Sequence, residues 1–354
     1  MKLKIAILLP SLENKGSLIV AKDIVNNTLI LYPNFADFTV FYFNDKFELV
    51  LNCETINLKF NVSYDFKEFQ IVHAHGYRPD KFLSRNKNLI NAKIISTIHC
   101  NVFEDLNYSY GKLVSLIYGR FWLYYLSNLD RVITLTNTHK AFYSKYMNNE
   151  KLRVVSNGRL IDVGDIPQTD KLLFKNIREA FPNSVLIGAF AILNKRKGLD
   201  QIIKALPNLK NHVLVVLGDG PLMLKLKALS KKIGVDNRCF FLGYRKDANK
   251  YMSYIDVYAL PSFSEAFPLS LIEACYSGVS SVCSNIPVLK EIYTENEVSF
   301  FELNNIKSLQ FALKRATKDK EVLGANAKSK TLVSYSMKQM VENYMNVYKD
   351  LVKK

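Results

Sequence analysis

Short apolar runs rich in β-branched residues recur along the chain, and longer stretches of mixed or amphipathic character separate them. The first series comprises residues 4–9, 38–43, 71–74, 93–98, 131–135 and 153–155. The second comprises residues 185–190, 212–217, 239–242, 257–260 and 280–283. Apolar strands that alternate with helical segments are typical of parallel sheets covered by helices on both faces. Two such series predict an α/β protein with two doubly wound, Rossmann-like domains in tandem.

The boundary between the domains is expected after Ser156-Asn157-Gly158, where the sequence becomes polar and rich in turn residues. We therefore assign residues 1–160 to the first domain and residues 161–335 to the second. The last element, residues 336–354, is predicted to be a helix because Ser336 and Gln339 form a capping box. Its apolar positions follow helical spacing, at Met340, Tyr344, Val347, Tyr348 and Leu351.

Composition narrows the class of protein. A chain of 354 residues with 49% hydrophobic side chains has enough apolar material for two cores, which excludes intrinsic disorder. The five cysteines contain no Cys-x-x-Cys pair, so neither a disulfide framework nor a zinc site is expected. The apolar run after Lys4 is too short for a signal peptide, and no stretch reaches the roughly 18 apolar residues that a transmembrane helix needs. We expect a cytoplasmic protein, soluble or peripheral to a membrane.

The net charge of +16 points to an anionic partner, which on charge alone is nucleic acid, an anionic membrane or a phosphorylated small molecule. The excess is unevenly distributed. Residues 171–250 carry 16 basic and 5 acidic side chains, which equals the whole surplus of residues 166–354. A local concentration at the start of the second domain favours a phosphorylated ligand there.

Two glutamates, Glu265 and Glu273, flank the start of a predicted helix that follows the strand 257–260. Pro268 suits the first turn of a helix, which would place Glu265 just before the helix and Glu273 about two turns into it. The free backbone N–H groups of such a strand-to-helix turn are suited to a phosphate. Carboxylates beside it are well placed for sugar hydroxyls.

This stretch resembles the Glu-x7-Glu motif of retaining nucleotide-sugar glycosyltransferases of the GT-B fold, in the large family four (glycosyl transferases group 1). Further segments are similar to that family and occur in its order, at residues 73–75, 97–99, 154–158, 197–205, 217–221, 241–247 and 286–291. The resemblance spans almost the whole chain. It implies two facing Rossmann-like domains, the first for the acceptor and the second for the donor, with the C-terminal helix returning to the first domain.

The resemblance also implies roles in the second domain. Glu273 would accept hydrogen bonds from the ribose hydroxyls, and Glu265 would hold a hydroxyl of the donor sugar. Lys197 would bind the diphosphate, and Arg196 would replace a family arginine whose position is occupied here by Ala191. The segment that approaches sugar and diphosphate would be Ala266, Phe267, Pro268 and Leu269. Ala266 stands where the family usually has glycine, so its φ must be negative.

Other positions follow from the same resemblance. Gly218 and Gly220 would border the nucleotide, and Tyr244 or Arg245 would lie near the base, although a plain surface loop is the alternative for these two side chains. In the first domain, Gly16 would occupy the family's glycine-rich turn. His99 would reach the donor sugar, with a structural histidine as the alternative.

Two features of the first domain have more than one interpretation. His73 and His75 share a face of a strand, as a metal pair would, but no third ligand is identifiable and the family uses no metal. We expect no metal and no cofactor, and a structural or acceptor-binding role for these histidines. The aromatic stretch 113–126 is either a buried helix with Arg120 at its rim or a helix that lies at a membrane interface.

The sequence thus predicts an enzyme that moves a hexosyl or N-acetylhexosaminyl group, with retention, from a UDP-sugar to a glycan or lipid-linked acceptor. Synthesis of a cell-surface polysaccharide such as O-antigen, capsule or lipopolysaccharide is the expected setting, with the inner face of the cell membrane as a further partner. Alternatives on the same fold are a nucleotide-sugar epimerase and a sugar phosphorylase. A basic nucleic-acid-binding protein is a remote alternative, because the charge surplus overlaps the predicted phosphate-binding turns.

Overall fold

The computed structural model describes residues 2–62, 64–161 and 164–353 and divides into two compact units. One unit contains residues 1–158 and 336–354, and the other contains residues 159–335. The expected first domain ended at residue 160, whereas the unit boundary falls between Gly158 and Arg159. The C-terminal helix belongs to the first unit, as expected.

The first unit is built on a seven-stranded sheet in the order β3-β2-β1-β4-β5-β6-β7, with every neighbouring pair parallel. Its strands are β1 (Leu3–Leu12), β2 (Ala36–Phe47), β3 (Glu54–Asn57), β4 (Ile71–His75), β5 (Lys93–Thr97), β6 (Arg131–Thr134) and β7 (Leu152–Val154). Its helices are α1 (Gly16–Leu31), α2 (Tyr77–Arg85), α3 (Val102–Tyr110), α4 (Lys112–Ser127), α5 (Asn137–Tyr143) and α13 (Met337–Val352). The strand order reverses between β1 and β4, where a doubly wound sheet usually binds its ligand.

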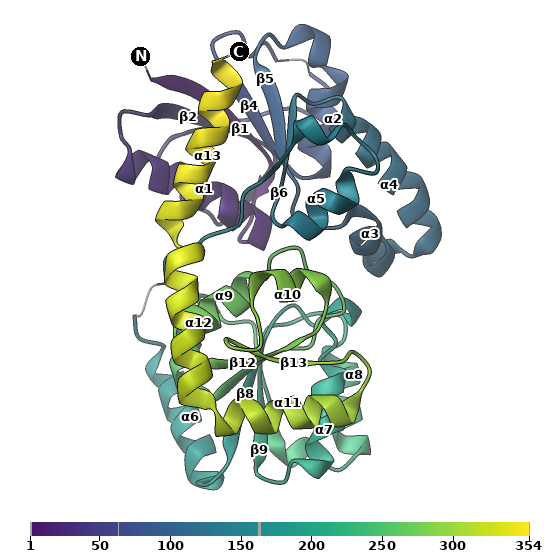
Figure 1. The fold of residues 1–354 in the computed structure, drawn as a ribbon, viewed down its shortest axis with the longest axis vertical. Helices are drawn as coiled ribbons and strands as arrows, with labels where there is room; N and C mark the ends of the chain where they lie inside the picture. The colour runs from purple at the N-terminus through teal and green to yellow at the C-terminus, as the bar shows by residue number, and fades with distance from the viewer. Residues whose placement is uncertain (1, 63, 162–163, 354) are drawn as a thin grey trace. The chain divides into compact units, whose positions relative to one another are not determined.

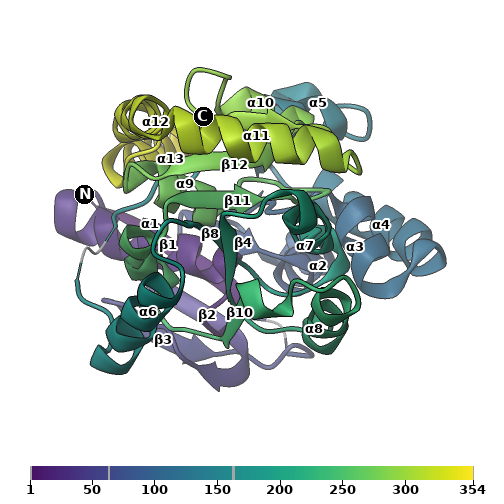
Figure 2. The same ribbon diagram turned by 90° about the horizontal axis from the view of Figure 1, so that it is seen from below.

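The second unit has a six-stranded parallel sheet in the order β10-β9-β8-β11-β12-β13. Its strands are β8 (Val185–Phe190), β9 (His212–Leu217), β10 (Cys239–Gly243), β11 (Val257–Leu260), β12 (Ser280–Ser284) and β13 (Ser299–Phe301). Its helices are α6 (Gln168–Ala180), α7 (Asp200–Ala205), α8 (Met223–Lys232), α9 (Leu269–Tyr276), α10 (Pro287–Ile292), α11 (Ile306–Lys318) and α12 (Lys320–Ser334). Figure 2 shows these helices on both sides of the sheet. The order reverses between β8 and β11.

Each unit has its own apolar core, as two tandem domains require. The central strands β4 and β9 are buried at every position, which explains why both read as unbroken apolar or uncharged runs. All eleven expected strands are present. Two further strands, β3 and β13, were not predicted from the sequence, and each lies at an outer edge of its sheet.

The C-terminal helix α13 is held by side chains that its spacing predicted. The Ser336 side chain accepts a hydrogen bond from the backbone N–H of Gln339 at 3.3 Å, so the predicted N-cap is confirmed. The five apolar positions are all buried, and α13 packs against α1 in the first unit. Tyr348 and Tyr344 also reach the sheet, where their hydroxyls lie 2.8 Å from His73 Nδ1 and 3.1 Å from Thr97 Oγ1. Across the described ranges, no helix has the length and apolar character to cross a membrane.

Candidate functional site: a cation and carboxylate cluster in the second unit

The Lys-Gly turn follows β8 and contains the 3₁₀ turn Lys195–Lys197, in which the Asn194 side chain accepts a hydrogen bond from the Lys197 N–H. Gly198 ends it with φ 61°, in the left-handed region. A Cβ atom at Gly198 would lie 2.3 Å from the Pro261 carbonyl oxygen, so only glycine allows this approach. The Phe263 N–H donates to the Arg196 carbonyl oxygen at 2.8 Å. The turn after β8 is therefore fixed against the segment after β11.

This approach brings three predicted residues together. The Lys197 Nζ atom lies 2.5 Å from Glu265 Oε1, and an Arg196 guanidinium N–H donates to Glu265 Oε2 at 3.3 Å. The same Arg196 nitrogen donates to the Ser264 carbonyl oxygen at 2.9 Å. The exposed fraction of the side chain is 6% for Glu265, 13% for Lys197 and 25% for Arg196. Two cations and one carboxylate thus form a mostly buried cluster beside the strand-order reversal.

The cluster sets the protonation of Glu265. Burial alone would raise its pKa, but the charges of Lys197 and Arg196 outweigh burial and lower the pKa below its ordinary value of 4.5. Glu265 is therefore ionised near neutral pH, when it accepts hydrogen bonds and donates none. Burial lowers the pKa of the Lys197 ammonium from its ordinary 10.5, against the opposing effect of Glu265.

Glu273 lies on α9 and has a partner that the sequence did not indicate. Arg159 donates to Glu273 Oε1 twice, from Nε at 2.9 Å and from a terminal nitrogen at 2.6 Å. Helix α9 begins at Leu269 with Pro268 as its N-cap, so Glu273 lies about one turn into the helix. Glu273 is therefore nearer the start of the helix than the two turns expected, and Pro268 is the N-cap rather than a residue of the first turn.

The segment between the two glutamates is buried. Ala266 and Phe267 are 7% and 6% exposed. Asp247 and Asn304 are the only non-glycine residues with positive φ in the described part of the chain. The φ of Ala266 is therefore negative, as an alanine in place of the family's glycine requires. The Tyr258 hydroxyl donates to Ser270 at 2.7 Å, and its pKa is raised by burial and additionally by the charges of both Glu265 and Glu273.

Gly218 and Gly220 follow the carboxyl end of β9, in the same sheet whose strands β8 and β11 lead to the cluster. A Cβ atom at Gly218 would lie 1.9 Å from the Ala191 carbonyl oxygen, and one at Gly220 would lie 2.7 Å from the Leu193 backbone. Both glycines therefore allow the turn after β9 to pack on the segment after β8. Their proximity to a nucleotide stays a prediction.

The residues after β10 differ from each other in exposure. The Tyr244 side chain is exposed. Arg245 is held by Asp170 at the start of α6, with Nε at 2.8 Å and a terminal nitrogen at 3.2 Å. The Tyr251 hydroxyl donates to the same Asp170 carboxylate at 2.5 Å. Arg245 therefore has a structural partner in this structure, and base contact by Tyr244 or Arg245 stays a prediction.

In the first unit, three histidines gather at the carboxyl ends of β4 and β5. His75 Nδ1 lies 2.9 Å from His99 Nε2, and the two rings stack with centroids 5.2 Å apart. His73 contacts Thr97 and Tyr348, each at 2.8 Å. Burial lowers the pKa of His99 to about 4 and that of His73 to about 3, so both rings are neutral at pH 7.

Gly16 is the first residue of α1 and follows β1. Strand β1 lies next to β4, which carries His73 and His75, and the strand order reverses between the two. Lys15 before Gly16 is the N-cap, and its ammonium pairs with Glu13 at 3.0 Å. Among the described residues, no group of three or more His, Cys, Asp or Glu side chains has the arrangement of a metal site.

Family models match both units. The model described as "Glycosyl transferases group 1" matches residues 171–331, and "Glycosyltransferase Family 4" matches residues 55–161. The chain is 29% identical to the O-antigen biosynthesis glycosyltransferase WclY of Escherichia coli over 99% of both proteins. It is 27% identical to a UDP-Gal:alpha-D-GlcNAc-diphosphoundecaprenol alpha-1,3-galactosyltransferase of Escherichia coli, over 81% of this chain and 76% of that protein.

Solved structures share the fold at low identity. HepE from Anabaena, solved with UDP and glucose, superposes with a TM-score of 0.82 at 16% identity, over 98% of this chain and 100% of that one. WaaG, a glycosyltransferase involved in lipopolysaccharide biosynthesis, gives a TM-score of 0.72 at 16% identity, over 97% of this chain and 99% of that one. These likenesses establish the GT-B fold.

Proposed function

Because the chain is a group 1 glycosyltransferase with the GT-B fold, we propose that it transfers a sugar from a nucleotide diphosphate to a glycan or lipid-linked acceptor, with retention of configuration. Relatives that are named for O-antigen synthesis and for a diphosphoundecaprenol acceptor support cell-surface polysaccharide synthesis as the setting. Solved neighbours with UDP or UDP-glucose support a UDP-sugar as the donor.

The observation that carries the proposal is the contact of Lys197 and Arg196 with Glu265. The two cations follow β8 and the carboxylate follows β11, so they flank the point where the strand order reverses. Ligands of open α/β sheets bind outside the carboxyl ends of strands at this point. The cluster has one net positive charge for a diphosphate and an ionised carboxylate for a sugar hydroxyl.

In the proposed reaction, the acceptor hydroxyl oxygen forms a bond to the anomeric carbon while the bond from that carbon to the β-phosphate oxygen breaks. The electron pair of the broken bond remains on the phosphate, which also takes the acceptor proton. Lys197 and Arg196 stabilise the negative charge that grows on this leaving group, and no metal ion is included. Glu265 orients the sugar, and Glu273 binds the ribose. Ala266 to Leu269 form the wall beside the sugar and diphosphate.

A membrane surface is the second partner in the proposal, and α4 supports it. Helix α4 buries Trp122, Leu123 and Leu126 against the first unit and leaves a row of apolar and aromatic side chains exposed. That row is Leu113, Leu116, Ile117, Tyr118, Phe121 and Tyr124. Two surface hollows of about 430 and 860 Å³ share Arg120 and Tyr124 in their linings, and Arg85 lines the larger. An exposed aromatic helix with arginines suits an anionic bilayer surface.

A thermal-shift screen with UDP-, GDP- and ADP-sugars tests the donor assignment. A ligand at a hundredfold excess over its Kd stabilises the folded protein by about 2.7 kcal/mol. We expect a UDP-sugar to raise the melting temperature and the double variant Lys197→Met/Arg196→Met to lose most of that shift. If no nucleotide sugar stabilises the wild-type protein, the proposed donor site is wrong. Conversion of the UDP-sugar without an acceptor would instead indicate an epimerase.

A further inference from the structure

Arg159 is the first residue of the second unit, and two nitrogens of its guanidinium donate to one oxygen of Glu273. The two contacts to Oε1, at 2.9 and 2.6 Å, come from different nitrogens of the guanidinium. The exposed fractions are 16% for the Arg159 side chain and 11% for the Glu273 side chain. Charge-assisted hydrogen bonds of this kind are stronger than neutral ones, and here they hold the Oε1 atom of the carboxylate in place.

The backbone of Arg159 is fixed as well. Its N–H donates to the Tyr335 carbonyl oxygen at 3.0 Å, which joins the first and last residues of the second unit. The Tyr335 ring meets the ring of Phe267 edge-on with centroids 5.3 Å apart. Phe267 belongs to the segment between the two glutamates. Arg159 is therefore held by the same group of residues that shapes the proposed donor wall.

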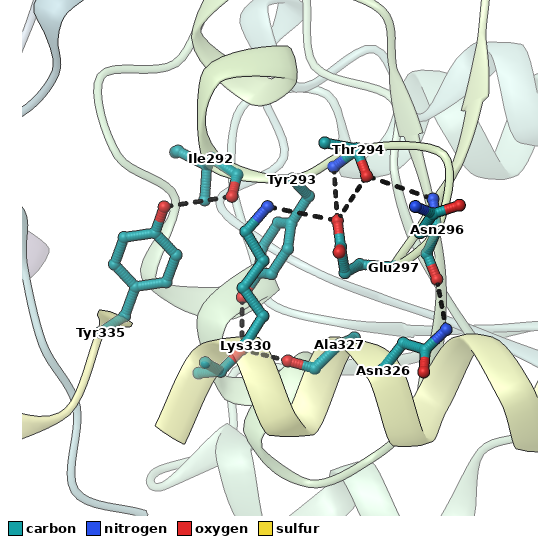
Figure 3. Close-up of polar contacts among 10 residues, drawn as sticks. Ile292, Tyr293, Thr294, Asn296, Glu297, Asn326, Ala327, Lys330 and Tyr335 are labelled. Atoms are coloured by element: carbon teal, nitrogen blue, oxygen red, sulfur yellow. Dashed lines mark hydrogen bonds and ion pairs between the residues drawn. The ribbon is translucent and has the colours of Figure 1, made fainter. Parts of the chain in front are cut away.

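Tyr335 is in turn anchored to the last residue of α10. Figure 3 shows its hydroxyl donating to the Ile292 carbonyl oxygen, at 3.1 Å. The loop that follows α10 is held to α12, because Lys330 pairs with Glu297 at 3.2 Å. Glu297 also accepts a hydrogen bond from the Thr294 N–H at 2.7 Å. The support for Arg159 thus extends through ordered polar contacts into the body of the second unit.

We infer that Arg159 is a positioning residue for nucleotide recognition: it orients the Glu273 carboxylate toward the ribose hydroxyls of the donor. This inference rests on the proposed function, which assigns the ribose to Glu273. An ionised carboxylate has about four lone-pair sites, so it can accept from Arg159 and from ribose at the same time. Without Arg159, the mostly buried Glu273 carboxylate would lose these two charge-assisted hydrogen bonds, which hold its Oε1 atom in place.

Titration calorimetry with UDP and 2′-deoxy-UDP isolates this role, because the two probes differ by one ribose hydroxyl. We expect wild-type protein to prefer UDP by roughly tenfold or more, the effect of a hydrogen bond to a charged group. Arg159→Met should remove most of this preference by weakening UDP binding alone. Arg159→Lys keeps the charge but loses the two-nitrogen donor group, and it should retain part of the preference for UDP. This variant also tests the inference if Arg159→Met does not fold.

Two further variants separate the possible results. Arg178→Met removes another arginine of the second unit, paired with Asp256 at 2.7 Å, and should leave the preference unchanged. If Glu273→Gln abolishes the preference and Arg159→Met retains it, Arg159 has no positioning role and the proposed function stands. If Glu273→Gln retains the preference, the ribose assignment itself is wrong. Tighter UDP binding by Arg159→Met would mean that Arg159 competes with ribose, which overturns the inference.

Discussion

The Lys197 ammonium lies 2.5 Å from the Glu265 carboxylate, 68 residues away in the sequence, and both side chains are mostly buried. Lys197 and Glu265 follow different strands of one parallel sheet and meet beside the strand-order reversal. Their contact turns two separate sequence motifs into one cluster of two cations and a carboxylate, which the proposed function assigns to phosphate and sugar.

Replacing Lys197 by Met should reduce kcat/KM for glycosyl transfer by roughly a hundredfold to a thousandfold, as removal of an oxyanion-hole donor does. The physical reason is that charge growing on the leaving phosphate loses its most buried cation. Steady-state transfer assays measure the change. Lys195→Met is the matched control, because Lys195 belongs to the same turn but is exposed. Equal activity of the two variants would refute the role of Lys197.

Replacing Gly198 by Ala should separate the turn after β8 from the segment after β11. The added Cβ would lie 2.3 Å from the Pro261 carbonyl oxygen, at a φ of 61°. Gly234→Ala is the control, since φ is 70° and no atom lies within 4 Å of its Cβ. We expect Gly234→Ala to cost about 1 kcal/mol of stability and Gly198→Ala to cost more and also to reduce activity. Thermal unfolding and transfer assays distinguish the two, and similar losses would mean that the contact has no functional effect.

The sequence predicted those parts of the fold and site that have a strong local signal. Short uncharged runs that are mostly apolar predicted β4 and β9, and a capping box predicted the start of α13. The edge strand β3 was missed because its four residues are mostly exposed and polar. The three-residue edge strand β13 was not predicted either. Edge strands pair on one side and need no continuous apolar run.

The same reasoning applies to the candidate site. Glu265 and Lys197 were predicted because each lies in a motif that resembles a known family, and Arg196 was predicted as the substitute for a family arginine. The structure brings the three side chains together. Arg159 was missed because its partner lies 114 residues away and no spacing rule connects them. A general signal did exist: a buried glutamate needs a cation, and the sequence left the partner of Glu273 unassigned.

Asp80 should make the stability of the first unit depend on pH. Burial raises the pKa of its carboxyl from 3.8 to about 7, with one oxygen accepting from Trp122 Nε1 at 2.7 Å. A raised acid pKa gives stability at low pH that is lost as the pH rises toward 7. Relative to Asp80→Asn, wild-type protein should lose on the order of 1 kcal/mol per pH unit between pH 4 and 7. Trp122 is the single tryptophan, so its fluorescence reports this unfolding. A constant difference across that range would contradict a raised pKa.

The exposed face of α4 should bind anionic vesicles. We expect wild-type protein to float with phosphatidylglycerol vesicles at low salt, and less with phosphatidylcholine vesicles or at high salt, because charge screening weakens the attraction of Arg85 and Arg120. Tyr118→Glu/Phe121→Glu should abolish flotation, since both side chains are about half exposed and their loss leaves the core intact. Leu224→Glu/Phe311→Glu is the control, because these residues are more exposed but lie in the second unit. Absence of wild-type flotation at low salt would rule out α4 as a membrane-binding surface, and equal loss in both double variants would mean that binding is not specific to α4.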